Sequence, residues 1–98
     1  MPNPAECQSM KELRAEIDRI DCALIALLAE RSGYIDRAAQ LKPAEGLPAR
    51  IDDRVAQVLE NIRQNATRAG LDPRLAHCLW QQIIDWSIAR EERVLGPR

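Results

Sequence analysis

The sequence predicts an all-helical fold with three helices, one long and two shorter. Apolar residues recur at steps of three and four along most of the 98 residues, and no segment has the alternating pattern of a β-strand. Prolines and glycines interrupt the pattern at two places and divide it into three parts. We therefore expect one helical domain over residues 1–98, in which residues 1–8 form an N-terminal extension.

The first and longest helix is expected to begin at a capping box formed by Ser9 and Glu12. Its seam positions alternate steps of four and three: Leu13, Ile17, Ile20, Leu24, Leu27, Arg31, Tyr34, Ala38 and Leu41. A helix of about 33 residues spans about 50 Å, which the rest of so short a chain cannot cover. The helix must therefore lie against something else, and we expect it to end at Pro43.

Two shorter helices follow a loop at residues 43–48. Apolar residues at helical spacing from Ile51 to Ala69 predict the second helix, and Gly70 is expected to end it as a left-handed cap. Asp72 and Pro73 then predict the start of the third, because an aspartate cap followed by proline favours a helix N-terminus. This helix is expected to run toward Leu95.

Charge and cysteine content exclude several classes of protein. Lys+Arg number 14 and Asp+Glu 15, so the formal net charge of −1 lacks the basic footprint of a general nucleic-acid binder or of a protein that binds anionic membranes. Cys7, Cys22 and Cys78 show no CxxC spacing, and with a single histidine they argue against a disulfide framework and a metal site. Cys22 and Cys78 lie among apolar helical neighbours, so we expect inert core thiols.

The sequence favours a cytoplasmic protein. Its first residues lack the basic and apolar regions of a signal peptide, and no apolar run approaches the length of a membrane span. Aromatic residues make up only 3% of the chain, which leaves a small core and favours an oligomer.

Arg31 is the residue that breaks the apolar seam. A guanidinium among Leu27, Leu28 and Tyr34 needs an anion, although an arginine that reaches solvent or pairs with an internal glutamate is an equally good interpretation. Lys42 follows eleven residues later and returns to within about 20° of the same helix face, roughly 16 Å along the axis. The two long side chains could converge on one dianion.

Arg14 precedes Arg31 by a distance of about 25 Å along the same helix, beyond the reach of one small ligand. If two copies of this helix pack antiparallel, Arg14 of one copy approaches Arg31 of the other, and a two-fold dimer repeats the arrangement. Taken alone, an arginine near the start of a helix is more often a solvated charge.

A carboxyl group continues the apolar stripe of the third helix. Trp80, Ile84, Ser87 and Glu91 share one face, with Ile88 as an alternative to Ser87. The simpler interpretation of Glu91 is an ion pair near the helix end, with Arg90, Arg93 or Arg54. His77 has no partner at a catalytic spacing, so we expect a surface or packing role.

A longer pattern unites these residues. It runs Leu13-Arg14-x-x-Ile17-Asp18-x-Ile20-Asp21-x-x-Leu24-Ile25-x-Leu27-Leu28-x-x-Arg31, followed by Lys42, Asp53-Arg54 and Gln82-Ile83-Ile84. This pattern, which covers roughly residues 9–95, resembles the all-helical chorismate mutases. Within that family, the chain is most similar to the subset that contains the isochorismate pyruvate lyases. The similarity is carried by the Pro-x-x-Cys-x-Ser segment near the N-terminus, Tyr34, Ala38-Ala39 and Ile83-Ile84-x-Trp86-x-Ile88-Ala89.

The resemblance implies an intertwined homodimeric helical bundle with two equivalent pockets, each completed by Arg14 of the partner chain. It further implies that Arg14 and Arg31 bind the substrate carboxylates, that Arg54 supports the pocket, and that Lys42 donates to the ether oxygen as the carbon–oxygen bond breaks. Such a pericyclic reaction needs no nucleophile and no cofactor, because the protein restricts the substrate conformation and stabilises developing charge.

Three positions depart from the mutase pattern. Ile51 and Val55 stand where many mutases carry acidic residues that meet the ring hydroxyl of chorismate, and an apolar residue after Arg54 is similar to the lyases. Glu91 stands where most bacterial members have a glutamine that donates to the ether oxygen, so it can donate only when protonated. Ser87 resembles a serine that lines the mutase pocket and touches a substrate carboxylate.

The leading hypothesis is a chorismate mutase that converts chorismate to prephenate. The alternative is an isochorismate pyruvate lyase that forms salicylate and pyruvate, and a 4-amino-4-deoxychorismate mutase is more distant. A non-enzymatic helical dimer is disfavoured, because a scaffold gains nothing from a charge buried in its seam.

Overall fold

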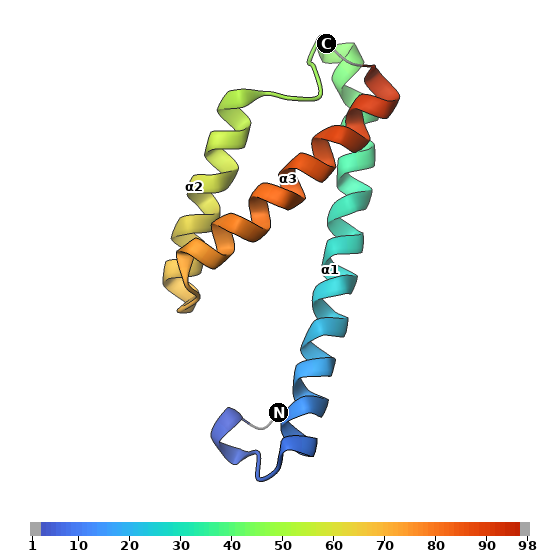
Figure 1. Ribbon diagram of the computed structural model, residues 1–98. Coiled ribbons are helices and arrows are strands. Elements are labelled where there is room, and N and C mark those ends of the chain that lie inside the picture. Colours follow the sequence, from blue (N-terminus) through green and yellow to red (C-terminus); the bar gives the residue numbers. More distant parts are fainter. Residues whose placement is uncertain (1–2, 97–98) are drawn as a thin grey trace. The chain divides into compact units, whose positions relative to one another are not determined.

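The computed structural model describes residues 3–96 and contains three α-helices (Figure 1). A short 3₁₀ turn, η1 (Pro4–Glu6), precedes α1 (Met10–Glu45), α2 (Asp52–Ala69) and α3 (Pro73–Leu95). No strand occurs among the described residues, so the all-helical prediction of one long and two shorter helices is confirmed.

No helix within residues 3–96 combines the length and the apolar character needed to cross a membrane.

The predicted capping box forms at the start of α1. The Ser9 hydroxyl accepts from the Glu12 backbone N–H at 3.1 Å, and the Glu12 carboxylate accepts from the Gln8 N–H at 2.9 Å. These bonds satisfy amides that the helix cannot pair within itself, which fixes the start of α1 at Met10.

The predicted end of α1, Pro43, is two residues too early. The helix continues through Pro43 to Glu45, and Gly46 ends it with a left-handed φ of 70°. The Leu47 N–H donates to the Lys42 carbonyl at 2.9 Å and the Gly46 N–H to the Pro43 carbonyl at 3.1 Å, which is a Schellman cap. Proline removes one helical hydrogen bond near the end, but the glycine cap closes the last turn three residues later.

The boundary between the other two helices and the end of α3 lie where the sequence predicts them. Gly70 ends α2 with a φ of 79°, and the Leu71 N–H donates to the Ala66 carbonyl at 2.9 Å. The Asp72 side chain accepts from the Arg74 N–H at 2.9 Å, and Pro73 occupies the first turn of α3. Both predicted caps are confirmed, and α3 ends at Leu95 as expected.

The chain divides into two compact units, with the boundary inside α1 between Gly33 and Tyr34. Among the described residues of the first unit none is buried. Its large exposed apolar side chains, which we call the exposed apolar row, are Met10, Ile17, Ile20, Leu24, Ile25, Leu27 and Leu28. The expectation of a single domain over residues 1–98 stays a prediction.

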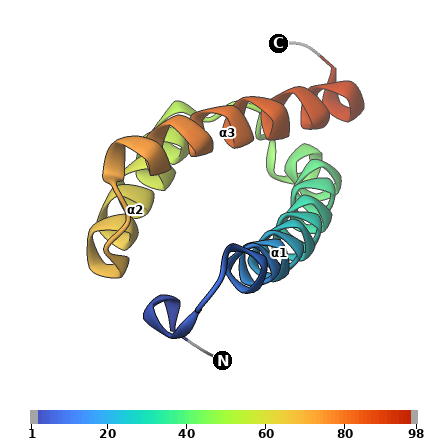
Figure 2. The same cartoon turned by 60° about the horizontal axis from the view of Figure 1, so that its bottom comes forward.

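The second unit contains its own small core. Helices α2 and α3 pack side by side, and the last turns of α1 meet the C-terminal end of α3 (Figures 1 and 2). The buried apolar residues are Ala39, Ala49, Ala66, Ala76 and Ile84, and two polar residues, Ser87 and Glu91, are buried with them. Since four of the five buried apolar residues are alanines, this core contains little side-chain volume.

The prediction that Cys22 and Cys78 are core thiols is wrong for the single chain. Both are exposed, Cys7 is partly exposed, and all three are free. The apolar neighbours that motivated the prediction, such as Leu24 and Leu79, are themselves about half exposed.

Candidate active site

A buried ion pair joins α1 to α3 in the second unit. The Nζ of Lys42 lies 2.6 Å from Oε1 of Glu91, and the two side chains are 17% and 6% exposed. Lys42 lies in the last turns of α1 and Glu91 one turn before the end of α3, so the meeting of these two helix ends forms the pair. A buried charge pair costs desolvation free energy, so it is unusual in a core made mostly of alanine.

The Lys42 ammonium has a second partner in the loop that leads to α2. Its Nζ donates to the Ala49 carbonyl at 2.8 Å. Oε1 of Glu91 is within ion-pair distance of Lys42 but accepts no hydrogen bond of good geometry within residues 3–96. Since an ammonium has three donors, these two contacts leave Lys42 the capacity to donate to a third acceptor.

Ser87 and Glu91 extend the buried stripe of α3, as the spacing predicts. Ser87 is 4% exposed, and its hydroxyl donates to the Ile83 carbonyl at 2.8 Å. Glu91 is also 4% exposed and follows one turn later, on the face that buries Ala76 and Ile84. The structure therefore brings Lys42, Ser87 and Glu91 into one neighbourhood.

The simpler interpretation of Glu91, an ion pair with Arg90, Arg93 or Arg54, does not hold. Its partner is Lys42, whereas Arg90 pairs with Asp36. Arg54 donates to the side chain of Gln57 at 2.6 Å and is exposed in the first turn of α2. Arg93 is exposed and Arg90 is partly buried against Asp36, whereas Glu91 lies on the buried side of the same turn.

Ile51 and Val55 lie at the N-terminal end of α2, one turn apart. Both are partly buried, and the Val55 N–H donates to the Ile51 carbonyl at 3.0 Å. Ile51 is the N-cap residue and supplies no side-chain hydrogen bond. The apolar pair thus flanks Arg54 at the start of this helix.

Arg14 and Arg31 belong to the first unit. Arg14 is exposed and Arg31 partly buried, and both lie on the continuous helix α1. Their separation of seventeen residues corresponds to about 25 Å of helix, so a small ligand cannot contact both within one chain. Their place relative to Lys42, Arg54 and Glu91 stays a prediction.

A second ion pair between α1 and α3, Asp36–Arg90, is not indicated by any pattern in the sequence. Arg90 donates through Nε and Nη2 to both carboxylate oxygens of Asp36, at 2.5 and 3.0 Å. These hydrogen bonds, followed by the positive charge of Arg90, hold the pKa of Asp36 below its ordinary value. Asp36 and Arg90 are 54 residues apart, so no local spacing could have indicated the pair.

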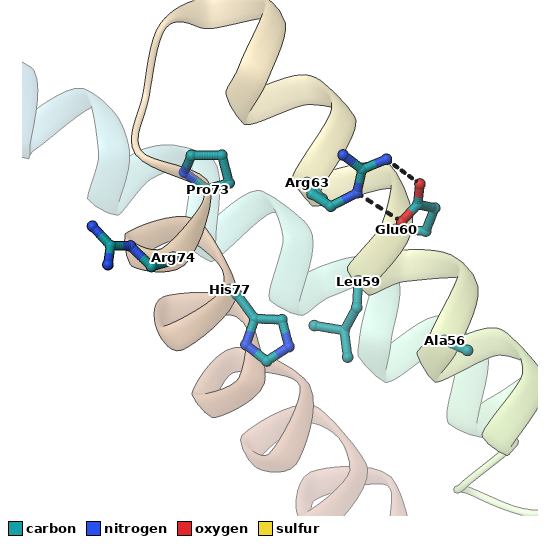
Figure 3. A pocket seen from close by; sticks show the side chains of 7 residues that line it. All are labelled: Ala56, Leu59, Glu60, Arg63, Pro73, Arg74 and His77. Atoms are coloured by element: carbon teal, nitrogen blue, oxygen red, sulfur yellow. Dashed lines mark hydrogen bonds and ion pairs between the residues drawn. The ribbon is translucent and has the colours of Figure 1, made fainter.

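An open pocket of about 440 Å³ lies where α2 faces the first turn of α3 (Figure 3). It is lined by Ala56, Leu59, Glu60, Arg63, Pro73, Arg74 and His77. Arg63 donates two hydrogen bonds to Glu60, which together with a bond from Gln64 lower the pKa of Glu60 to about 2. His77 is exposed here, as expected of a surface residue, and none of the predicted site residues lines this pocket.

Within the described residues, no group of three or more histidine, cysteine, aspartate or glutamate side chains is arranged to hold a metal ion.

Comparison with known proteins gives one family. Residues 13–92 match the model of chorismate mutase type II. An isochorismate pyruvate lyase of Pseudomonas aeruginosa is 35% identical over 92 residues, which cover 93% of this chain and 89% of that protein. A chorismate mutase of Methanocaldococcus jannaschii is 25% identical over 88 residues, covering 90% of this chain and 89% of that protein.

A longer relative contains a similar segment. The bifunctional chorismate mutase/prephenate dehydratase of Aquifex aeolicus is 31% identical over 99 residues, which cover 93% of this chain but 27% of that protein. The likeness therefore concerns only about a quarter of the bifunctional protein.

Proposed function

Because the chain belongs to the chorismate mutase type II family, we propose that it converts chorismate to prephenate in a pocket that includes Lys42 and Glu91. The observation that supports this most directly is the partly buried ammonium of Lys42, which lies 2.6 Å from the buried Glu91 carboxylate. A cation held in a mostly apolar interior can stabilise negative charge on a bound substrate more strongly than one in water.

The rearrangement breaks one bond and forms another within the substrate. The ether carbon–oxygen bond of the enolpyruvyl group breaks as a carbon–carbon bond to the ring forms, and the electron pairs shift around a six-membered transition state. No proton is lost or gained overall. Negative charge develops on the ether oxygen, and Lys42 has the capacity to donate a hydrogen bond to it.

The substrate is a dianion, and in this proposal three arginines receive it. Arg31 and Arg14 bind the two carboxylates through charge-assisted hydrogen bonds, and Arg54 supports the pocket from the start of α2. Since Arg14 and Arg31 are about 25 Å apart on one helix, Arg14 comes from a second copy of the chain. The exposed apolar row of the first unit supports such a homodimer, because it offers a surface for the partner helix.

Glu91 and Ser87 complete the catalytic end of the pocket in this proposal. Ser87 lies one turn before Glu91 on the same buried face and can contact a substrate carboxylate. Glu91 keeps Lys42 in place when ionised, and in its protonated form it can itself donate to the ether oxygen.

An isochorismate pyruvate lyase is the second candidate. The 35% identity to the lyase of Pseudomonas aeruginosa favours it, and so does the apolar Val55 directly after Arg54. In that reaction the same ether bond breaks while a hydrogen moves from the ring to the enolpyruvyl methylene carbon, which yields salicylate and pyruvate. The binding demands on Lys42 and the arginines are the same, so the ring isomer decides between the two reactions.

The test is to incubate the purified protein with chorismate and, separately, with isochorismate. Prephenate from chorismate with little salicylate from isochorismate supports the mutase, and Ile51 and Val55 are then tolerated substitutions. Efficient release of salicylate and pyruvate contradicts the mutase and supports the lyase. No product from either substrate contradicts both and favours the aminodeoxychorismate mutase or the non-enzymatic dimer.

A further inference from the structure

Two ion pairs join the same two helix ends in the second unit. Lys42 and Glu91 meet in the interior, whereas Asp36 and Arg90 meet at the surface, with side chains 47% and 42% exposed. Arg90 and Glu91 are neighbours in the chain, so their side chains leave α3 about 100° apart. The outer pair therefore fixes the stretch of α3 that carries the inner carboxylate.

Arg90 is restrained from two sides. Two N–H groups of its guanidinium, which form a planar fork, donate to the two carboxylate oxygens of Asp36. This bidentate geometry fixes the direction of the contact as well as its distance. The ring of Trp86, one turn earlier on α3, lies 5.4 Å from the guanidinium carbon, within the range of a cation–π contact. Because Trp86 orients the fork on its own helix, the bond to Asp36 places the end of α3 against α1.

We propose that Asp36 and Arg90 are positioning residues that hold the Glu91 carboxylate against the Lys42 ammonium. The inference rests on the proposed function, in which Lys42 donates to the ether oxygen of the substrate. A displacement of about 1 Å in a catalytic group can lower the rate by up to about 10²-fold. A half-exposed ion pair, by contrast, contributes little to the stability of the fold. A positioning role therefore predicts a lower rate in variants of Asp36 and Arg90, whereas a purely structural role predicts only a small loss of stability.

The first experiment measures turnover in variants of the outer pair. Asp36→Asn removes the charge but keeps the shape, and Arg90→Lys keeps the charge but removes the fork. We expect each to lower kcat about tenfold with a smaller change in KM, and the double variant to be no worse than either single one. The matched control is Glu60→Gln, which breaks an ion pair of similar exposure on α2 and leaves kcat unchanged.

A wild-type kcat in folded Asp36→Asn would contradict the proposal. So would full activity in Arg90→Lys, because a purely electrostatic role needs only the charge. Since the outer pair is exposed, both variants are expected to keep the far-ultraviolet circular dichroism of the parent protein.

The second experiment needs no turnover. Lys11 and Lys42 are the two lysines of the sequence, and Lys11 is exposed whereas Lys42 is partly buried. The rate at which an amine-acylating reagent modifies Lys42, divided by the rate for Lys11, is measured by mass spectrometry. If the outer pair holds the inner one, Asp36→Asn raises this ratio by about threefold or more, because the Lys42 contacts open more often.

An unchanged labelling ratio in Asp36→Asn and Arg90→Lys overturns the positioning role. A wild-type protein that converts neither chorismate nor isochorismate overturns the proposed function instead, and the labelling ratio still decides whether Asp36 and Arg90 hold the buried pair.

Discussion

The two units of the chain differ in how far their apolar side chains are buried. The first unit buries no described residue and exposes a row that includes Leu24 and Leu27, whereas the second buries five apolar residues and the Lys42–Glu91 pair. The second unit therefore brings together Lys42, Ser87 and Glu91 of the proposed site from its own chain. The first carries Arg14 and Arg31 on a helix whose apolar side still needs a covering surface, and this contrast is what a shared, two-chain pocket predicts.

Removing Arg31 is expected to have the largest effect on activity. Arg31→Ala deletes one half of the proposed carboxylate recognition, so kcat/KM should fall by roughly 10²- to 10³-fold while the helical content is retained. Steady-state kinetics with circular dichroism as the folding check measures both. A folded variant that keeps most of its kcat/KM would remove Arg31 from the site.

A charge in the exposed apolar row tests whether a second copy covers it. Leu24 is 51% exposed in the single chain, so Leu24→Asp should change little if the protein is a monomer. In a homodimer the new carboxylate would be buried without a partner, and sedimentation should detect dissociation to monomers. Asn65→Asp adds the same charge on the exposed side of α2 and serves as the control. Identical sedimentation of both variants and the wild type would contradict the covered row.

The role of Glu91 is tested by the dependence of activity on pH. An ion pair with Lys42 requires the ionised carboxyl group, whereas donation to the ether oxygen requires the protonated one. We expect the pH profiles of kcat to differ between the wild type and Glu91→Gln, because the amide donates at every pH but carries no charge that could hold Lys42. Superimposable profiles from about pH 5 to 8 would exclude Glu91 as a donor.

The smallest effect is expected far from the site, at the exposed pair between Glu60 and Arg63. The pKa of Glu60 is lowered to about 2 from 4.5, so the folded state gains stability from this carboxylate above the higher value and loses it as the pH falls toward the lower. Glu60→Gln should lower Tm slightly at neutral pH, and the difference from wild type should vanish by about pH 2. A difference that grows on acidification would contradict the assignment.

The helix boundaries were largely predictable because their signals are local. The Ser9 capping box, the Gly70 cap and the Asp72-Pro73 start each depend on residues within one turn, and the structure has all three. The end of α1 was mispredicted because Pro43 weakens a helix but does not end it, whereas the glycine cap at Gly46 does.

The partners of charged side chains were less predictable. The spacing of α3 placed Glu91 on the buried face, but the choice of Lys42 over nearby arginines depends on how α1 meets α3. The Asp36–Arg90 bridge depends on the same packing and left no trace in the sequence pattern. The burial of Cys22 and Cys78 was also not predictable from their neighbours. Both are exposed, because apolar neighbours along a helix do not by themselves create a core in one chain.

The most direct test of the proposed two-chain pocket is to mix two variants that this proposal expects to be inactive homodimers, one carrying Arg14→Ala and the other Arg31→Ala. After the chains exchange, one pocket of each mixed dimer contains both arginines and the other contains neither. The account predicts that activity returns with the fraction of mixed dimers, toward half the wild-type activity per mixed dimer. If native mass spectrometry detects mixed dimers and the mixture stays inactive, the two arginines do not complete one pocket across the chains.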